Sequence, residues 1–281
     1  MNPQQFKIAS YINNILSQKR KSRYYVHSTF ERVVNYTDGD SFISITDSAI
    51  PVTPSSVSLN DSNLFNLIRT QSNSEAVFNL SYPILYSQET SLSFLNSDIV
   101  DTKIDSLTLP SKIQIEKFVI TILSHTRSQK GVIQIFHQKN DDIFSKKFSE
   151  ILASLKENIL DNDPDRFEKG INKLAGLGNG LTPSGDDFIY GLYAAIRTFS
   201  FKPEFAKKIE YIIDNGKTVF GDISYNFLKS LRDGHIYIPL KKLFRLLSSN
   251  SGCEEAIDDL IKYGLTSGTD ILAGVMFALE A

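Results

Sequence analysis

The chain has 281 residues, 41% hydrophobic and 22% charged, so it is long enough for one large domain or two ordinary ones with a sizeable core. Its 30 basic and 32 acidic side chains give a net charge of -2, which argues against partners such as nucleic acid or an anionic membrane. The single cysteine, Cys253, excludes an internal disulfide framework and a cysteine-based zinc site. The sequence has neither a signal-peptide pattern nor an apolar run near the roughly 18–20 residues of a membrane span, so we expect a cytoplasmic protein.

The first 110 residues have the pattern of a mainly β domain that begins with a helix. Apolar residues at helical spacing predict an amphipathic helix over residues 4–20. Short β-type runs then occur, separated by turn residues, at 42–46, 57–59, 76–80 and 104–109. Residues 61–75, rich in Asn and Ser, fit either a loop or a short helix. Short strands at this spacing predict a small β-sandwich or barrel-like domain over 1–110.

Residues 111–281 predict an all-helical domain, so the fold class is α+β with a boundary near Pro110. Apolar residues recur with a period of about 3.6 in successive segments. These predict helices over 115–123, 148–159, 167–174, 184–198, 203–217, 223–232, 240–247, 254–263 and 268–281.

One stretch of the helical half occurs twice. Residues 180–187 read GLTPSGDD, and residues 264–270 read GLTSGTD, where Pro183 has no counterpart. The offset is 84 residues at the start of the stretch and 83 from Ser184 onward, and it continues through Gly191 and Gly274. Two copies indicate a duplicated helix–glycine loop–helix unit rather than a solenoid. Because such units usually pack about a pseudo-twofold axis, we expect the two loops to lie together and form the site.

The duplicated loop has a structural interpretation and a functional one, and the sequence leaves both open. Ser184 with Asp187, and Ser267 with Asp270, have the spacing of a capping box, and acidic residues in a first turn complement the helix dipole. Small residues four apart, at 191 and 195 and again at 274 and 278, favour close helix packing. Capping and packing alone would account for the repeat.

The functional interpretation is a binding site for a small anion or phosphorylated ligand. A glycine-rich loop that opens a helix presents N–H groups to an anion, and hydroxyl groups add donors there. The carboxylates predict that a cation, an amide group or a sugar hydroxyl also enters, and Mg²⁺ binds one or two carboxylates together with phosphate oxygens. The candidate ligand-binding residues are Asn179, Thr182, Ser184, Gly185, Asp186, Asp187, Thr266, Ser267, Gly268 and Asp270, of which Asp186 and Asp187 are also the candidate Mg²⁺ ligands.

Elsewhere the sequence offers only one further candidate pair. The four histidines are scattered without metal-ligand spacing, and no catalytic residue is assigned. In the segment 26–35, Ser28 and Arg32 would supply a hydroxyl and a guanidinium to an anion. The alternative for this segment is an ordinary β strand with a solvent-facing arginine.

The string GLGNGLTPSGDDF at 176–188 resembles the signature of a bacterial family that includes AllH, a subunit of the oxamate carbamoyltransferase of allantoin catabolism. The family's C-terminal echo of this signature has its counterpart at 264–274, and its early S-x-F-x-R-x-x-N segment at 28–35. The early segment departs from the family at His27, where a glycine is frequent, and at Thr29, where the family has valine.

The resemblance implies a component of a carbamoyl-transfer system in purine catabolism, in which oxalurate and phosphate exchange with oxamate and carbamoyl phosphate. It implies other subunits as partners and small, planar, anionic ligands. The chemistry would be positioning and electrostatic stabilisation rather than covalent catalysis. The alternative is a non-catalytic ligand-binding or assembly subunit in which the repeat is mainly structural.

Overall fold

The computed structural model describes residues 6–73, 76–138 and 142–281. The chain divides into two compact units. The β unit comprises the residues up to Lys103 together with His235–Ile238, and the helical unit comprises Ile104–Gly234 and Pro239–Ala281. A mainly β region followed by helices confirms the predicted α+β fold class. In the described part of the chain, no helix combines the length and hydropathy needed to cross a membrane.

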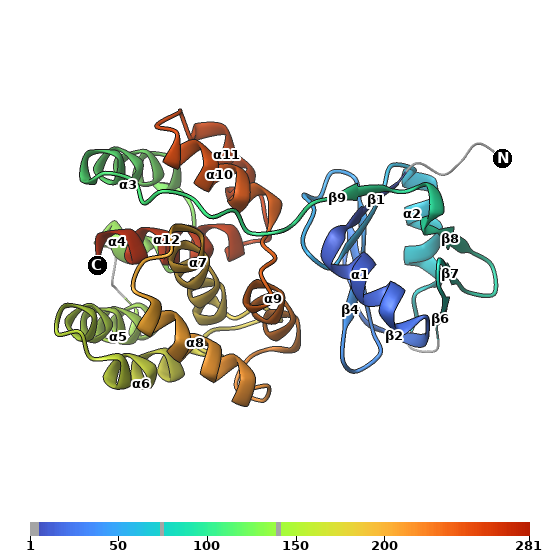
Figure 1. Ribbon diagram of the computed structural model, residues 1–281, viewed down its shortest axis with the longest axis horizontal. Helices are drawn as coiled ribbons and strands as arrows, with labels where there is room; N and C mark the ends of the chain where they lie inside the picture. Colours follow the sequence, from blue (N-terminus) through green and yellow to red (C-terminus); the bar gives the residue numbers. More distant parts are fainter. Residues whose placement is uncertain (1–5, 74–75, 139–141) are drawn as a thin grey trace. The chain divides into compact units, whose positions relative to one another are not determined.

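The β unit is built on one curled, open sheet of nine strands in the order β8-β7-β6-β2-β3-β4-β5-β1-β9 (Figure 1). The pairs β4–β5 and β1–β9 are parallel and the other pairs are antiparallel. A single curled sheet corresponds to the barrel-like alternative rather than to a two-sheet sandwich. The strands are β1 (Phe6–Ala9), β2 (Lys21–Thr29), β3 (Val33–Thr37), β4 (Phe42–Asp47), β5 (Ser56–Leu59), β6 (Val77–Ser81), β7 (Ile84–Tyr86), β8 (Ser91–Ser93) and β9 (Asp98–Val100).

Two helices, α1 (Ser10–Lys19) and α2 (Ser62–Gln71), complete the core of the β unit. Their apolar residues join those of the central strands in one buried cluster, in which Ile12 and Phe65 are both 1% exposed. Helix α2 begins at Asp61, whose side chain accepts hydrogen bonds from the N–H groups of residues 63 and 64. The Asn/Ser-rich segment therefore contains a helix, and residues 74 and 75 of it lie outside the described part.

Two predicted elements of this half need correction. The helix predicted at 4–20 is confirmed over Ser10–Lys19, but Phe6–Ala9 forms strand β1, because it pairs with β5 on one side and with β9 on the other. Residues 4 and 5 lie outside the described part. The predicted strand at 104–109 is an extended segment without a ladder partner: Ile104 N–H donates to Gly234 O, and Leu107 N–H donates to Thr198 O. In both segments, hydrogen-bond partners that are distant in the sequence determine the secondary structure.

The segment His235–Ile238 belongs to the β unit although it lies far along the chain. It forms a β-bridge between His235 and Lys103, and Ile236 N–H donates to Thr102 O over 2.7 Å. Next to the bridge, the buried Thr102 hydroxyl lies 2.9 Å from His235 Nδ1. These bonds anchor the end of the β unit's first segment.

The helical unit contains the predicted helices, with boundaries close to those expected. Apart from the one-turn helix α4 (Ile133–Phe136), they are α3 (Lys112–Thr126), α5 (Ile143–Leu160), α6 (Pro164–Leu174), α7 (Ser184–Phe199), α8 (Pro203–Asn215), α9 (Asp222–Arg232), α10 (Ile238–Ser248), α11 (Glu254–Ile261) and α12 (Ser267–Glu280). Helices α7 and α12 are buried along nearly their whole length and pack on each other at the centre of the unit (Figure 1).

Candidate functional site

Helices α7 and α12, which begin in the two repeated loops, cross with their backbones in contact. A Cβ atom at Gly191 would overlap the carbonyl oxygen of Ile271, and a Cβ atom at Gly274 would overlap the carbonyl oxygen of Phe188. With an offset of 83 residues, 191 corresponds to 274 and 188 to 271. The two contacts are therefore reciprocal, and each glycine allows the other helix to approach.

In each of these helices, the N–H group of the second helical residue donates to the loop before the helix. Gly185 N–H donates to Leu177 O over 2.8 Å, and Gly268 N–H donates to Tyr263 O over 3.0 Å. Near the two helix starts, the Thr182 hydroxyl of the first loop lies 3.1 Å from the Ser267 hydroxyl of the second loop. The structure thus brings the two repeated loops together, as the repeat predicted.

The backbone N–H groups at the two helix starts are largely committed to the fold. Besides the two glycines, Asp186 and Asp187 donate to Pro183 O, and Asp270 donates to Thr266 O. Any ligand at these loops therefore meets side-chain groups rather than these amide protons.

The capping-box interpretation is wrong for both loops. The N-cap residues are Pro183 and Thr266, and neither makes a side-chain capping bond. Ser184 and Ser267 instead occupy the first helical positions. Their hydroxyls are not used to cap these helices.

Asp186 is a structural clamp. Its Oδ1 accepts a hydrogen bond of 2.6 Å from Gly176 N–H, and its Oδ2 accepts one of 3.1 Å from Gly221 N–H. The carboxylate thereby ties the start of α7 to the loop before it and to the start of α9. Burial raises the pKa of Asp186, and the two backbone donors oppose that shift.

We expect Asp186→Ala to lower the free energy of unfolding by about 2–4 kcal/mol, because it leaves two N–H groups without their acceptor. Asp187→Ala is the matched control in the next position, and we expect a change within about 1 kcal/mol, since no backbone donor depends on its Oδ2. Urea unfolding of the two variants checks this. Equal losses would show that Asp187 is also a structural clamp.

Asp187 and Asp270 occupy equivalent positions in the two copies, and both are buried, at 5% and 0% exposure. Asp270 Oδ1 accepts a 2.7 Å hydrogen bond from Val132 N–H. The Oδ2 atoms of both carboxyls are buried and make no hydrogen bond with any described residue. A buried polar atom without a partner costs free energy, so these two oxygens are candidates for bonds from a ligand, beside the hydroxyl groups that lie near both carboxyls.

The electrostatics of the two carboxyls are coupled. Burial raises the pKa of Asp187 well above its ordinary value, and the negative charge of Asp270 adds to this shift. Burial likewise raises the pKa of Asp270 to about 6. Hydroxyl groups near the carboxyls have the opposite effect, because hydrogen bonding favours the ionised form. The Ser267 hydroxyl lowers the pKa of Asp187, and the Ser184 hydroxyl lowers the pKa of Asp270. Each serine thus acts on the carboxyl of the other loop.

The hydroxyl groups lie nearer to solvent than the carboxyls. Thr182, Ser184, Thr266 and Ser267 are half-buried, and Asn179 is exposed on the first loop. Tyr263, which lies just before the second loop, is not among the residues that the sequence predicts for the site. Burial raises the pKa of Tyr263, and the charge of Asp187 raises it further, so this phenol stays protonated near the carboxyls. Its place directly before Gly264 is the signal that would have indicated it.

Ser28 and Arg32 lie in the β unit, whereas the loops lie in the helical unit. The Ser28 hydroxyl accepts a 3.0 Å hydrogen bond from Asn35 Nδ2, and Asn35 Oδ1 accepts one of 2.8 Å from the Ser44 hydroxyl. These bonds join β2, β3 and β4, so this part of the early segment has a structural role. Arg32 is exposed in the connection between β2 and β3. Ligand binding by Ser28 and Arg32 stays a prediction.

The positions of Asp186 and Asp187 can be compared with what a Mg²⁺ site requires. Within residues 6–73, 76–138 and 142–281, no three His, Cys, Asp or Glu side chains gather closely enough to hold a metal ion. Both oxygens of Asp186 accept backbone N–H groups, so Asp187 is the better placed of the two predicted ligands. A Mg²⁺ ion held by one or two carboxylates and a phosphate stays a prediction.

Residues 174–279 match the family model of the oxamate carbamoyltransferase subunit AllH. The match includes both repeated loops and the whole of α7, so this part of the chain is similar to AllH. The resemblance expected from residues 176–188 and 264–274 is thereby confirmed. The β unit's sheet lies outside the matched residues. No solved structure matches the chain.

Proposed function

We propose that this chain is a subunit of a carbamoyltransferase system, and that the paired loops bind a small acid bearing an amide or ureido group. The supporting observation is the pair of unpartnered carboxyl oxygens, on Asp187 and Asp270, where the two AllH-type loops meet. Oxamate and oxalurate carry N–H groups beside a carboxylate. A carboxylate oxygen accepts such an N–H, and the surrounding hydroxyls donate to the ligand's anionic oxygens.

The raised pKa values make the two carboxyls suited to unequal roles. Two buried acids in mutual repulsion favour a state in which one keeps its proton. In the proposed complex, the ionised carboxyl accepts the ligand's N–H and the protonated one donates to an oxygen. The system's reaction would then rely on positioning a carbamoyl group against phosphate, with partner subunits completing the active site.

A thermal-shift comparison tests this proposal with oxamate, carbamoyl phosphate and inorganic phosphate, each with and without Mg²⁺. A ligand at one hundred times its Kd stabilises by about 2.7 kcal/mol, so we expect at least one of these probes to raise Tm by about 5 °C or more. The rise should disappear in Asp187→Ala, whose unliganded Tm stays close to that of the wild type. No shift with any probe, or equal shifts in both proteins, would refute ligand binding at the loops.

A second candidate function, assembly without ligand binding, is favoured by one observation. Leu181 and Leu265 occupy equivalent positions in the two loops and are 45% and 85% exposed. The two loops lie together, so the two leucines offer apolar surface on which a partner subunit could pack. If the loops serve assembly alone, we expect Leu181→Ser and Leu265→Ser to weaken co-purification with partner subunits, and we expect none of the probes to raise Tm.

A further inference from the structure

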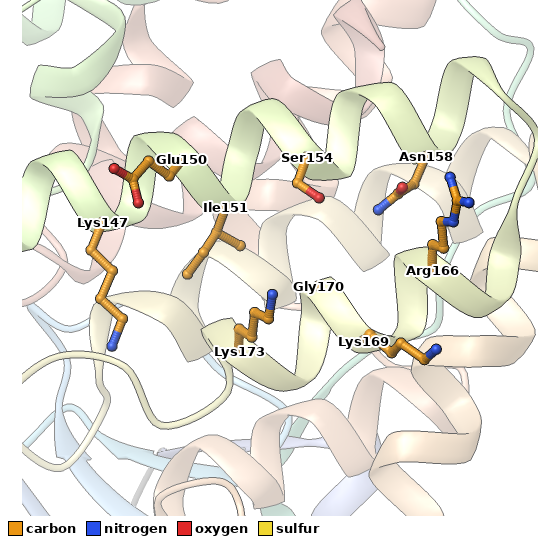
Figure 2. Close-up of a pocket in the computed structure, with 9 residues that line it drawn as sticks. All are labelled: Lys147, Glu150, Ile151, Ser154, Asn158, Arg166, Lys169, Gly170 and Lys173. Atoms are coloured by element: carbon orange, nitrogen blue, oxygen red, sulfur yellow. The ribbon is translucent and has the colours of Figure 1, made fainter.

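A second charged feature of the helical unit lies away from the repeated loops. Helices α5 and α6 form an antiparallel pair, and a groove of about 460 Å³ runs between them (Figure 2). Four basic side chains line it, Lys147, Arg166, Lys169 and Lys173, and one acidic side chain, Glu150. The groove therefore carries a net charge of +3 (four minus one), although the whole chain carries -2.

The cations of this basic groove are only partly balanced by nearby acids. No salt bridge joins a described residue to Lys147, Lys169 or Lys173. Arg166 forms a salt bridge with Asp163, three residues earlier, in which Nε and Oδ2 are 3.3 Å apart. The other face of α6 differs, because there Asp165 and Glu168 lie 2.6 and 2.9 Å from Lys208 Nζ. The acids of α6 thus form their ion pairs with α8, although the charge of Asp165 also acts on Lys169, and the groove keeps an excess of positive charge.

Asn158 is the feature that points to a specific ligand rather than to solvated lysines. It is only 6% exposed, it lines the groove, and no hydrogen bond joins its side-chain amide to another described residue. Asn is a poor helix former, and its amide atoms are not enclosed by the protein, so they are open to a ligand in the groove. Figure 2 shows this amide on the groove side of α5, near Arg166.

The dimensions of the groove restrict the ligand. Arg166 and Lys173 are seven residues apart on α6, which places their backbones about 10 Å apart along the helix. In Figure 2, Lys147 and Lys173 lie toward one end of the groove and Arg166 toward the other. A ligand that meets both ends must be elongated, with several anionic oxygens and a charge near -3. Oligophosphates have these properties, and Arg, Lys and an Asn amide all donate to phosphate oxygens.

We propose that the groove between α5 and α6 binds an oligophosphate group, either free or as the phosphate chain of a nucleotide. Binding depends on Lys147, Lys169, Lys173 and Arg166 for charge and on the Asn158 amide for a directed hydrogen bond. This site is separate from the one proposed at the repeated loops, so either can fail without the other.

Isothermal titration calorimetry of the full chain tests this proposal with inorganic pyrophosphate, tripolyphosphate and a nucleoside diphosphate. We expect binding that weakens with added salt, and tighter binding of the nucleoside diphosphate than of pyrophosphate would assign the nucleotide as the source. Lys169→Gln combined with Lys173→Gln should weaken binding about tenfold or more. Lys147→Gln should weaken it about threefold, whereas Lys146→Gln, an exposed neighbour outside the groove, should change it less than twofold.

Asn158→Leu separates ligand recognition from folding. It removes the amide and keeps a side chain of similar size, so we expect about a fivefold loss of binding with an unchanged or higher Tm. The proposal is overturned if none of the three probes binds, if Lys146→Gln weakens binding as much as Lys147→Gln, or if Asn158→Leu binds as the wild type does.

Discussion

Replacing Gly191 by alanine is expected to lower the free energy of unfolding by about 3 kcal/mol, or Tm by about 6–12 °C. The new Cβ would overlap the carbonyl oxygen of Ile271, which is backbone and cannot rotate away. Helices α7 and α12 would have to separate, and they form the centre of the helical unit. This loss outweighs the roughly 1 kcal/mol by which alanine favours a helix over glycine. Thermal and urea unfolding measure the effect.

Two comparisons make this prediction specific. Gly274→Ala should lower the free energy of unfolding by a similar amount, because its contact with Phe188 is the reciprocal one. The double variant should lose less stability than the two single variants added together, since one separation of the helices relieves both overlaps. Gly170→Ala is the matched control: its Cβ would meet only the end of the Leu155 side chain, at 2.5 Å, which can move. A loss at Gly170 as large as at Gly191 would contradict the close crossing of α7 and α12.

Asp270→Asn is expected to stabilise the protein at neutral and alkaline pH, by about 3 kcal/mol at pH 8. Burial raises the pKa of Asp270 from 3.8 to about 6, so the folded state holds its proton more tightly than the unfolded state does. The associated stability is complete below about pH 4 and is lost as the pH rises through about 6. Asparagine keeps an oxygen for Val132 N–H and carries no charge, so it avoids that loss.

The measurement is the free energy of unfolding from pH 4 to 8, for the wild type and for Asp270→Asn and Asp187→Asn. The difference between wild type and Asp270→Asn should grow in favour of the variant between pH 4 and 6. Asp187→Asn should show the same sign, because the pKa of Asp187 is also raised. A wild type that is more stable than both variants at pH 8 would mean that the two charges stabilise the fold.

These two predictions indicate a division within one loop. The glycines and Asp186 hold the helices together, whereas Asp187 and Asp270 weaken the fold at neutral pH. Polar groups that cost stability and are kept in a buried place are typical of functional sites. This division supports ligand binding at the loops. The structural interpretation of the repeat applies to the glycines and Asp186, and the functional interpretation applies to Asp187 and Asp270.

The sequence predicted the helical unit well because its signals are local. The apolar period of 3.6 and the Asp and Pro residues before α6 are all contained in short windows, and the repeat itself predicted that the two loops lie together. The sheet was less predictable. Phe6–Ala9 has helical spacing, and only its pairing with β5 and β9, more than 45 residues away, makes it a strand.

The candidate site shows the same limit. The sequence identified Asp186 and Asp187 together, but could not separate them, because the donors to Asp186 come from Gly176 and from Gly221 on another helix. Asn158 gave no signal at all, since its unpartnered amide is visible only when α5 and α6 are placed side by side. Roles that depend on a distant partner, or on its absence, require the structure.

The central claim is that Asp187 and Asp270 are two coupled, buried carboxyls kept for a ligand. Its most direct test is a ¹³C NMR titration of the aspartate carboxyl carbons with and without oxamate, with Asp187→Asn and Asp270→Asn to assign the signals. We predict that both carboxyls titrate above the ordinary aspartate range, Asp270 at about 6, and that oxamate shifts both titrations. Ordinary titration of both carboxyls near pH 4, or curves that oxamate leaves unchanged, would contradict the claim.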